Sequence, residues 1–147
     1  HRIARRQRQM CIRDSVGAWK HVNQLKHQLE LKNVHQQAPL RAMISRSHST
    51  REANVLATAY KGVEFIEKGS SLKLCAVADG QADLYLRLGP TSEWDTAAAQ
   101  CIVESAGGQV LTAELRPLRY NQKDSLLNPA FVVSRQNQDN LSLLFES

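Results

Sequence analysis

The chain has 147 residues, which suits a single domain with a buried core. Five of its 19 basic groups and one of its 14 acidic groups lie in residues 1–15, so the remainder holds 14 basic and 13 acidic groups. A nucleic-acid surface needs basic residues spread over the folded part, and this nearly neutral remainder argues against a nucleic-acid partner. The three cysteines form no Cys-x-x-Cys pair, which argues against a zinc site or a disulfide framework and favours a reducing cytoplasm.

Residues 1–15 differ in character from the rest of the chain. The string from Arg5 to Ser15 resembles translated sequencing-adapter read-through, and the chain has no initiator Met. We therefore expect residues 1–15 to be an artefact or a disordered head and leave them out of the fold prediction. A basic arm and a targeting peptide are the alternatives. No apolar run in the sequence is long enough for a signal peptide or a transmembrane helix.

From residue 16 onward, strand patterns alternate with helical patterns of about ten residues, which predicts an α/β layer fold. Predicted strands cover 17–20, 40–45, 63–66, 82–88, 109–112 and 131–133, and residues 21–37 fit either a strand or a helix. Predicted helices run from a capping box at Ser49 and Glu52 to about Tyr60, from 69–71 to Gly80, and from Glu93 to Ala106. The folded domain is expected to span 16–134, with an irregular stretch at 113–129 and a polar tail at 135–147.

The run Glu93-Trp94-Asp95-Thr96-Ala97-Ala98, followed by Ala106-Gly107-Gly108, is the most informative stretch. Asp95 favours the start of a helix, because its carboxylate caps free backbone N–H groups, and it also suits a hard cation such as Mg²⁺. Gly107 suits the left-handed position after the helix. The predicted apolar face holds Ala98, Ile102, Val103 and Ala106, and the helical cysteines Cys75 and Cys101 are expected to be buried. On the residues alone, an ordinary capped amphipathic helix accounts for this run.

The run nevertheless resembles the C-terminal signature of the inositol monophosphatase superfamily, and other segments narrow the likeness to 3′(2′),5′-bisphosphate nucleotidases of the CysQ type. These segments are 44–48 (Ile-Ser-Arg-Ser-His), 69–73 (Gly-Ser-Ser-Leu-Lys), 78–85 (Ala-Asp-Gly-Gln-Ala-Asp-Leu-Tyr) and 128–131 (Asn-Pro-Ala-Phe). Asp79 replaces the usual Glu and Ala130 the usual Gly. The likeness runs from about Gly17 to Ser134. Taken singly, 45–48 also fits a polar strand end and 69–73 a Ser-capped helix.

The resemblance implies the C-terminal part of a layered α/β phosphatase fold and a set of site residues. Asp95 would be a Mg²⁺ ligand. The substrate-side candidates share hydroxyl, imidazole or cationic groups that suit a phosphate. They are Ser45, Arg46, Ser47, His48, Ser70, Ser71, Lys73, Arg87 and Asp95.

The superfamily's upstream Glu and its Asp-Pro-x-Asp-Gly-Thr motif do not occur in this sequence. One carboxylate cannot assemble the metal cluster that phosphomonoester hydrolysis needs, so we expect a fragment that is inactive alone. The intact enzyme would convert 3′-phosphoadenosine 5′-phosphate to AMP and phosphate in sulfur assimilation. The resemblance implies a small nucleotide as partner and a cytoplasmic location, and it leaves peripheral association with the inner membrane open. The alternatives are an inositol monophosphatase or other sugar phosphatase, and a non-catalytic basic binding module.

Overall fold

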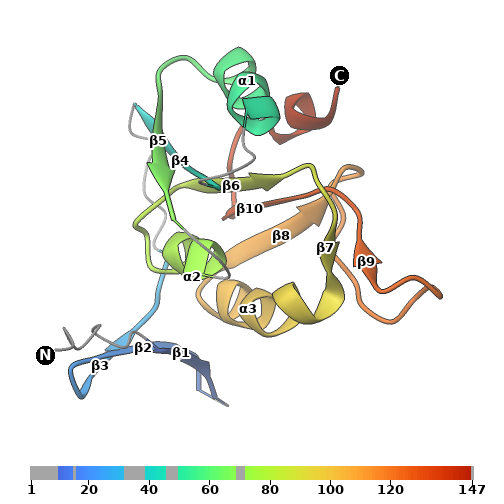
Figure 1. Ribbon diagram of the computed structural model, residues 1–147. Helices are drawn as coiled ribbons and strands as arrows, with labels where there is room; N and C mark the ends of the chain where they lie inside the picture. Colours follow the sequence, from blue (N-terminus) through green and yellow to red (C-terminus); the bar gives the residue numbers. More distant parts are fainter. Residues whose placement is uncertain (1–9, 15, 32–38, 46–49, 69–71, 147) are drawn as a thin grey trace, which may run out of the picture.

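The computed structural model of the protein describes residues 10–14, 16–31, 39–45, 50–68 and 72–146 (Figure 1). Its centre is a five-stranded sheet with the order β5-β4-β6-β10-β8. β4 (Leu40–Ile44) pairs in parallel with both β5 (Val63–Glu67) and β6 (Leu84–Arg87). β10 (Phe131–Arg135) runs antiparallel between β6 and β8 (Gly108–Thr112). The mixed sheet confirms the predicted α/β class.

Both faces of this sheet are buried along β4, β6, β8 and β10, because neighbouring residues of these strands belong to different cores. Leu40, Ala42, Leu84, Leu86, Leu111 and Val132 pack in one core with Leu56 of α1 (Thr50–Ala59). Met43, Tyr85, Val110, Phe131 and Val133 pack in the other with side chains of α2 (Leu72–Ala78) and α3 (Glu93–Ser105). The period of two along each strand therefore produces a sheet covered by helices on either side.

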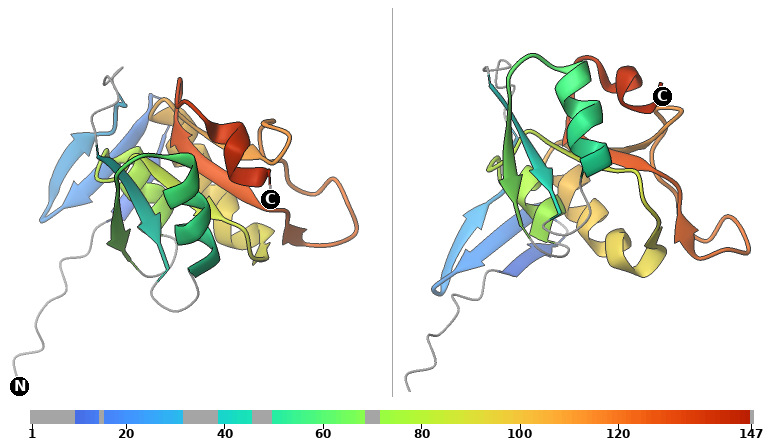
Figure 2. Two further views of the ribbon diagram at one scale, coloured as in Figure 1. Left: turned by 90° about the horizontal axis from the view of Figure 1, so that it is seen from above. Right: turned by 45° about the horizontal axis from the view of Figure 1, so that its top comes forward.

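Two smaller sheets complete the architecture. β1 (Met10–Arg13), β2 (Ala18–Val22) and β3 (Leu25–Gln28) form an antiparallel sheet, which lies beneath α2 and α3 in Figure 1. β7 (Thr91–Ser92) pairs with β9 (Leu127–Asn128) just before α3 begins. Figure 2 shows β7 and β9 at one end of the molecule, opposite the three-stranded sheet. This short pairing brings residues far apart in sequence to the start of α3.

The structure differs from the sequence expectations at both ends of the chain. Residues 10–13, which the sequence analysis left out of the fold, form β1 and pair with β2. The origin of residues 1–15 stays a prediction. The 135–147 tail contains a 3₁₀ helix, η1 (Leu141–Phe145), in which Leu144 is 1% exposed. Because Leu141 and Leu144 pack into the α1 core, this part of the tail is folded.

Several local predictions can be checked directly. α2 and α3 end at the predicted glycines, and Gly107 has φ +95°. Cys101 and Ala98 are exposed rather than buried, because the buried stripe of α3 passes through Ala99, Ile102 and Val103. Cys75 is half-buried beside the core. No described helix has the length and apolar character needed to cross a bilayer.

Candidate functional site

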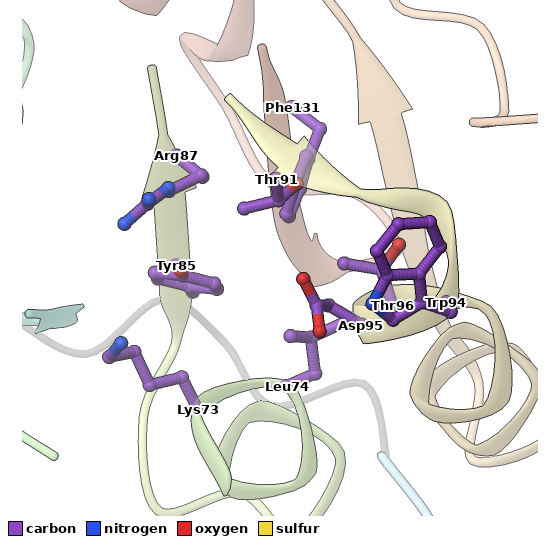
Figure 3. Close-up of a pocket in the computed structure, with 9 residues that line it drawn as sticks. All are labelled: Lys73, Leu74, Tyr85, Arg87, Thr91, Trp94, Asp95, Thr96 and Phe131. Atoms are coloured by element: carbon purple, nitrogen blue, oxygen red, sulfur yellow. The ribbon is translucent and has the colours of Figure 1, made fainter. Parts of the chain in front are cut away.

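The candidate site is a cavity of about 400 Å³ between the sheet and the helices α2 and α3 (Figure 3). Five elements line it, from α2 to β10. Its lining residues are Lys73, Leu74, Tyr85, Arg87, Thr91, Trp94, Asp95, Thr96 and Phe131. In Figure 3 the cations Lys73 and Arg87 lie on either side of Tyr85, and Asp95 faces into the same space from α3.

Asp95 reaches the cavity because α3 begins at its wall. Ser92 is the N-cap residue and has extended backbone angles, φ −87° and ψ 148°. The Asp95 Oδ2 atom accepts a hydrogen bond from the Ser92 amide at 3.2 Å. The carboxylate thus satisfies a backbone donor at the helix start, which fixes its direction in the first turn. The helix-capping function expected for Asp95 is present in the structure.

Lys73 is a cation in an unusually buried position, with only 5% of its surface exposed. Its Nζ atom donates a hydrogen bond to Ser45 Oγ at 2.8 Å and lies 5.4 Å from the centre of the Tyr85 ring. Burial, followed by the nearby positive charge of Arg87, lowers the pKa of Lys73 below its ordinary value. Both effects disfavour the charged ammonium, and an anion bound beside it would offset them.

Arg87 adds the second positive charge from the end of β6. Its Nη2 atom donates to the Pro90 carbonyl at 3.3 Å, whereas its buried Nε atom has no hydrogen-bond partner within the described structure. Neither Arg87 nor Lys73 forms an ion pair with a described carboxylate. A half-buried guanidinium with one buried, unpaired donor is suited to bind an anionic ligand.

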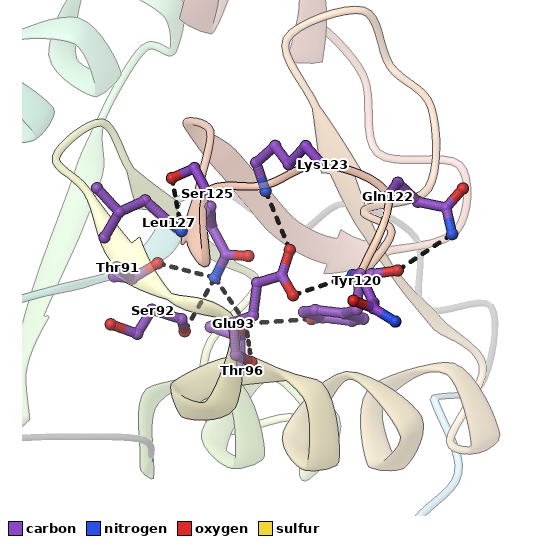
Figure 4. Close-up of polar contacts among 11 residues, drawn as sticks. Thr91, Ser92, Glu93, Thr96, Tyr120, Gln122, Lys123, Ser125 and Leu127 are labelled. Carbon is purple, nitrogen blue, oxygen red and sulfur yellow. Dashed lines mark hydrogen bonds and ion pairs between the residues drawn. The ribbon is translucent and has the colours of Figure 1, made fainter.

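A second group of contacts fixes the far side of the α3 start (Figure 4). Glu93 is buried and accepts hydrogen bonds from the Asn121 amide and from Lys123 Nζ, each at 3.0 Å. The Asn121 amide, and then Lys123, hold the pKa of the Glu93 carboxyl below its ordinary value. The Glu93 amide donates to the Leu126 carbonyl at 2.8 Å. The irregular 113–129 stretch is therefore anchored to the first turn of α3.

The structure brings four of the predicted site residues together. Lys73, Arg87 and Asp95 line the cavity, and Ser45 joins them through Lys73. Arg46, Ser47, His48, Ser70 and Ser71 lie outside the described residues. The roles assigned to all nine stay predictions.

The cavity is also lined by residues that were not among the sites predicted from the sequence, namely Tyr85, Thr91, Thr96 and Phe131. Tyr85 and Phe131 have the period-two pattern of core strands, which carries no sign of a cavity. Their rings pack edge to face, with centroids 6.0 Å apart, and form the cavity wall. Thr96 directly follows Asp95, so its place in the Trp94-Asp95 motif was the signal that could have identified it as a site residue.

Asp95 is chemically suited to Mg²⁺, because hard cations prefer carboxylate oxygens. Within the described residues, however, no three His, Cys, Asp or Glu side chains gather into a group that would hold a metal. Among the described residues, Asp95 is thus suited to supply one ligand to Mg²⁺. These residues do not form a complete metal site.

Comparison with known proteins identifies relatives of the chain. The sequence model of the inositol monophosphatase family matches residues 7–146. The chain is 39% identical over 117 residues to the 3′(2′),5′-bisphosphate nucleotidase CysQ of Escherichia coli K12, which covers 80% of the chain and 46% of that protein. It is 38% identical over 96 residues to CysQ of Haemophilus influenzae, covering 65% of the chain and 36% of that protein.

A solved structure gives the same result. CysQ from Bacteroides thetaiotaomicron, described as a bacterial member of the inositol monophosphatase family, superimposes with a TM-score of 0.74 at 33% identity. The superposition covers 90% of this chain and 55% of that one. The chain spans about half the length of these curated relatives. By fold and by sequence, it belongs to the inositol monophosphatase family.

Proposed function

We propose that this chain supplies the C-terminal part of the active site of a 3′(2′),5′-bisphosphate nucleotidase, which hydrolyses 3′-phosphoadenosine 5′-phosphate to AMP and phosphate. The observation that carries the proposal is the pairing of two cations, Lys73 and Arg87, in one cavity with the carboxylate of Asp95. A nucleotide bisphosphate has two separate phosphates, so it needs an anion site in addition to the site of hydrolysis. The likeness to CysQ proteins supports the same substrate class.

The residues of this chain have distinct tasks in the proposed reaction. Lys73 and Arg87 bind one phosphate of the nucleotide through charge-assisted hydrogen bonds and so orient the other. Ser45 keeps the Lys73 ammonium in place through its 2.8 Å hydrogen bond. Asp95 would hold one Mg²⁺ ion. Such an ion would supply a binding site for the reacting phosphate and lower the pKa of the attacking water.

The proposal treats the chain as part of a longer enzyme. No group of three metal-ligating side chains lies among the described residues, and the match to this chain covers 46% of the E. coli relative. We therefore propose that the 147-residue chain alone is inactive and that the full-length product of its gene is active.

The first prediction tests the proposal through Asp95→Asn in the full-length product. Asparagine also caps helices, so the fold should persist. Loss of the charge should weaken Mg²⁺ binding at least 10- to 100-fold, the range seen when even outer partners of a metal ligand are removed. Phosphate release from 3′-phosphoadenosine 5′-phosphate, measured across Mg²⁺ concentrations, should shift accordingly and recover in part at high Mg²⁺. An unchanged Mg²⁺ dependence would show that Asp95 is not a metal ligand.

The matched variant is Lys73→Ala, which should raise the KM for the nucleotide more than it changes the Mg²⁺ requirement. Inositol monophosphate serves as the competing substrate. If the enzyme prefers it to the bisphosphate nucleotide, the proposed substrate class is wrong, and a sugar phosphatase of the same family is the better description.

A further inference from the structure

Asn128 does not line the cavity, but its side chain contacts residues at the start of α3. It is 5% exposed and sits in β9, opposite Thr91 of β7. Its Nδ2 atom lies 3.1 Å from Thr91 Oγ1, 3.2 Å from the Ser92 carbonyl and 2.8 Å from Thr96 Oγ1. The two N–H bonds of this amide are thus shared among three oxygens on either side of Asp95, whereas its buried Oδ1 atom has no partner among the described residues.

These three acceptors define the position of the Asp95 turn. Ser92 is held at both of its backbone polar atoms, because its amide donates to Asp95 and its carbonyl accepts from Asn128. Thr96 is the residue immediately after Asp95, is 3% exposed, and also accepts a hydrogen bond from the Tyr120 hydroxyl at 3.1 Å. A rotation of this turn would leave buried polar atoms without partners, so the network favours one orientation.

We propose that Asn128 is a positioning residue, which holds the first turn of α3 so that the Asp95 carboxylate faces the cavity. The inference rests on the proposed function, since it concerns the metal ligand assigned there. It goes beyond that assignment because the orientation of Asp95 would depend on Asn128 of β9, which lies 36 residues after Ser92 in the sequence. Asn128 acts through Ser92 and Thr96 and does not itself contact the ligand site.

The test uses two variants in the full-length product of the gene. Asn128→Ala removes the donor, and Thr96→Val removes one acceptor while it keeps the side-chain shape. Each should weaken Mg²⁺ binding about tenfold, as loss of outer partners of a metal ligand does. Isothermal titration calorimetry with Mg²⁺ alone measures this without any turnover. Amide hydrogen exchange over residues 91–97 should also speed up in both variants, because the turn is less restrained.

Gln109→Met is the matched control. Gln109 is another amide that donates to two oxygens, Ser134 Oγ and the Arg135 carbonyl, each at 3.2 Å, but it lies in β8 and shares no partner with Asn128 or Thr96 in the described structure. Its loss should lower the melting temperature and leave the Mg²⁺ affinity within about twofold of the parent, since additivity holds for separate sites.

A double-mutant cycle separates this inference from the proposed function. In an Asp95→Asn background, Asn128→Ala should have little further effect on Mg²⁺ affinity, because the group it positions is already lost. If Asp95→Asn weakens Mg²⁺ binding but Asn128→Ala and Thr96→Val do not, the positioning role is wrong and the proposed function stands. If Gln109→Met weakens Mg²⁺ binding as much as they do, the effect is general stability and the inference also fails. If Asp95→Asn has no effect, the metal assignment itself fails.

Discussion

At the scale of single residues, Lys73 is the group whose chemistry departs most from that of a surface lysine. It is nearly fully buried, it has no ion-pair partner within the described part of the chain, and the positive charge of Arg87 helps to lower its pKa. Burying an unpaired ammonium is unfavourable, so the site is less stable than an apolar one of the same shape. A bound phosphate would supply the missing negative charge.

The pH dependence of nucleotide binding follows from this environment. The pKa of Lys73 is lowered in the folded protein, so it loses its proton below 10.5, the ordinary value for a lysine. Affinity for the nucleotide should therefore fall on the alkaline side at a pH below 10.5. The folded protein releases this proton before the unfolded chain does, so the free energy of unfolding should rise with pH between the two pKa values.

Lys73→Arg is the control for this second prediction, because arginine stays charged throughout the range. Calorimetric titration of the full-length product with the nucleotide, in metal-free buffer across the alkaline range, measures the effect. The parent protein should lose affinity and the Lys73→Arg variant should not. Parallel loss in both proteins would assign the alkaline transition to a different group.

At the scale of elements, the connection from α3 to β8 requires two glycines for different reasons. Gly107 follows the C-cap residue Ala106 and has φ +95°, which glycine adopts without steric strain. Gly108 has no such angle, but a Cβ atom there would lie 2.7 Å from Val103 Cγ1 and 3.0 Å from the Ser134 carbonyl. Its role is to let α3, β8 and β10 approach closely, so that both ends of α3 are fixed.

The third prediction is that Gly108→Ala lowers stability through overpacking. The added methyl group must displace the backbone of β10 as well as a side chain, so the expected loss is about 1–3 kcal/mol in the free energy of unfolding. Gly17→Ala is the control, since the nearest atom to its Cβ is the flexible end of Gln28 at 3.4 Å. Chemical denaturation of the full-length product gives both values. Equal stability of the two variants would mean that the α3–β8 junction has room that the structure does not indicate.

At the scale of the whole molecule, the described chain leaves edges and apolar side chains exposed. β5 is an edge of the central sheet, and the outer strand β3 is exposed along its length. Trp94, next to Asp95, is 69% exposed, and Leu25 is 63% exposed. Unpaired strand edges and uncovered apolar groups promote association.

The fourth prediction is that the 147-residue chain, produced alone, associates or is poorly soluble and shows no Mg²⁺-dependent hydrolysis of 3′-phosphoadenosine 5′-phosphate. Sedimentation velocity and a phosphate-release assay check the two parts. The full-length product, assayed in the same buffers, is the control and should be soluble and active. A monomer of the short chain that melts cooperatively would contradict the first part, and turnover by it the second.

The fifth prediction concerns the gene. The genomic DNA upstream of codon 16 should encode, in frame, roughly a hundred or more further residues, because the 117 matched residues are 46% of the E. coli relative. These residues should include Asp-Pro-x-Asp-Gly-Thr, which would complete the ligand set. A start codon at position 1, with no such motif upstream, would show that the chain is not a truncated enzyme.

The sequence by itself determined the features that depend on near neighbours in the chain. The helix α3 follows from Asp95 near its start and Gly107 after its end, and the central strands follow from their alternating apolar residues. The family follows from motifs whose order and spacing are visible in the sequence, such as Trp94-Asp95 and 69–73. These features rest on local backbone preferences and short periodicities, which sequence records directly.

Only the tertiary structure decided which of these residues meet. Lys73, Arg87 and Asp95 come from three elements and share a cavity because α2 and α3 both pack on the sheet face that carries Tyr85 of β6. The burial of Leu144 and the exposure of Cys101 depend on which face another element covers. The contact of Asn128 with the start of α3 depends on a two-residue strand pairing. Such contacts are set by the packing of the whole chain, and no local pattern in the sequence specifies them.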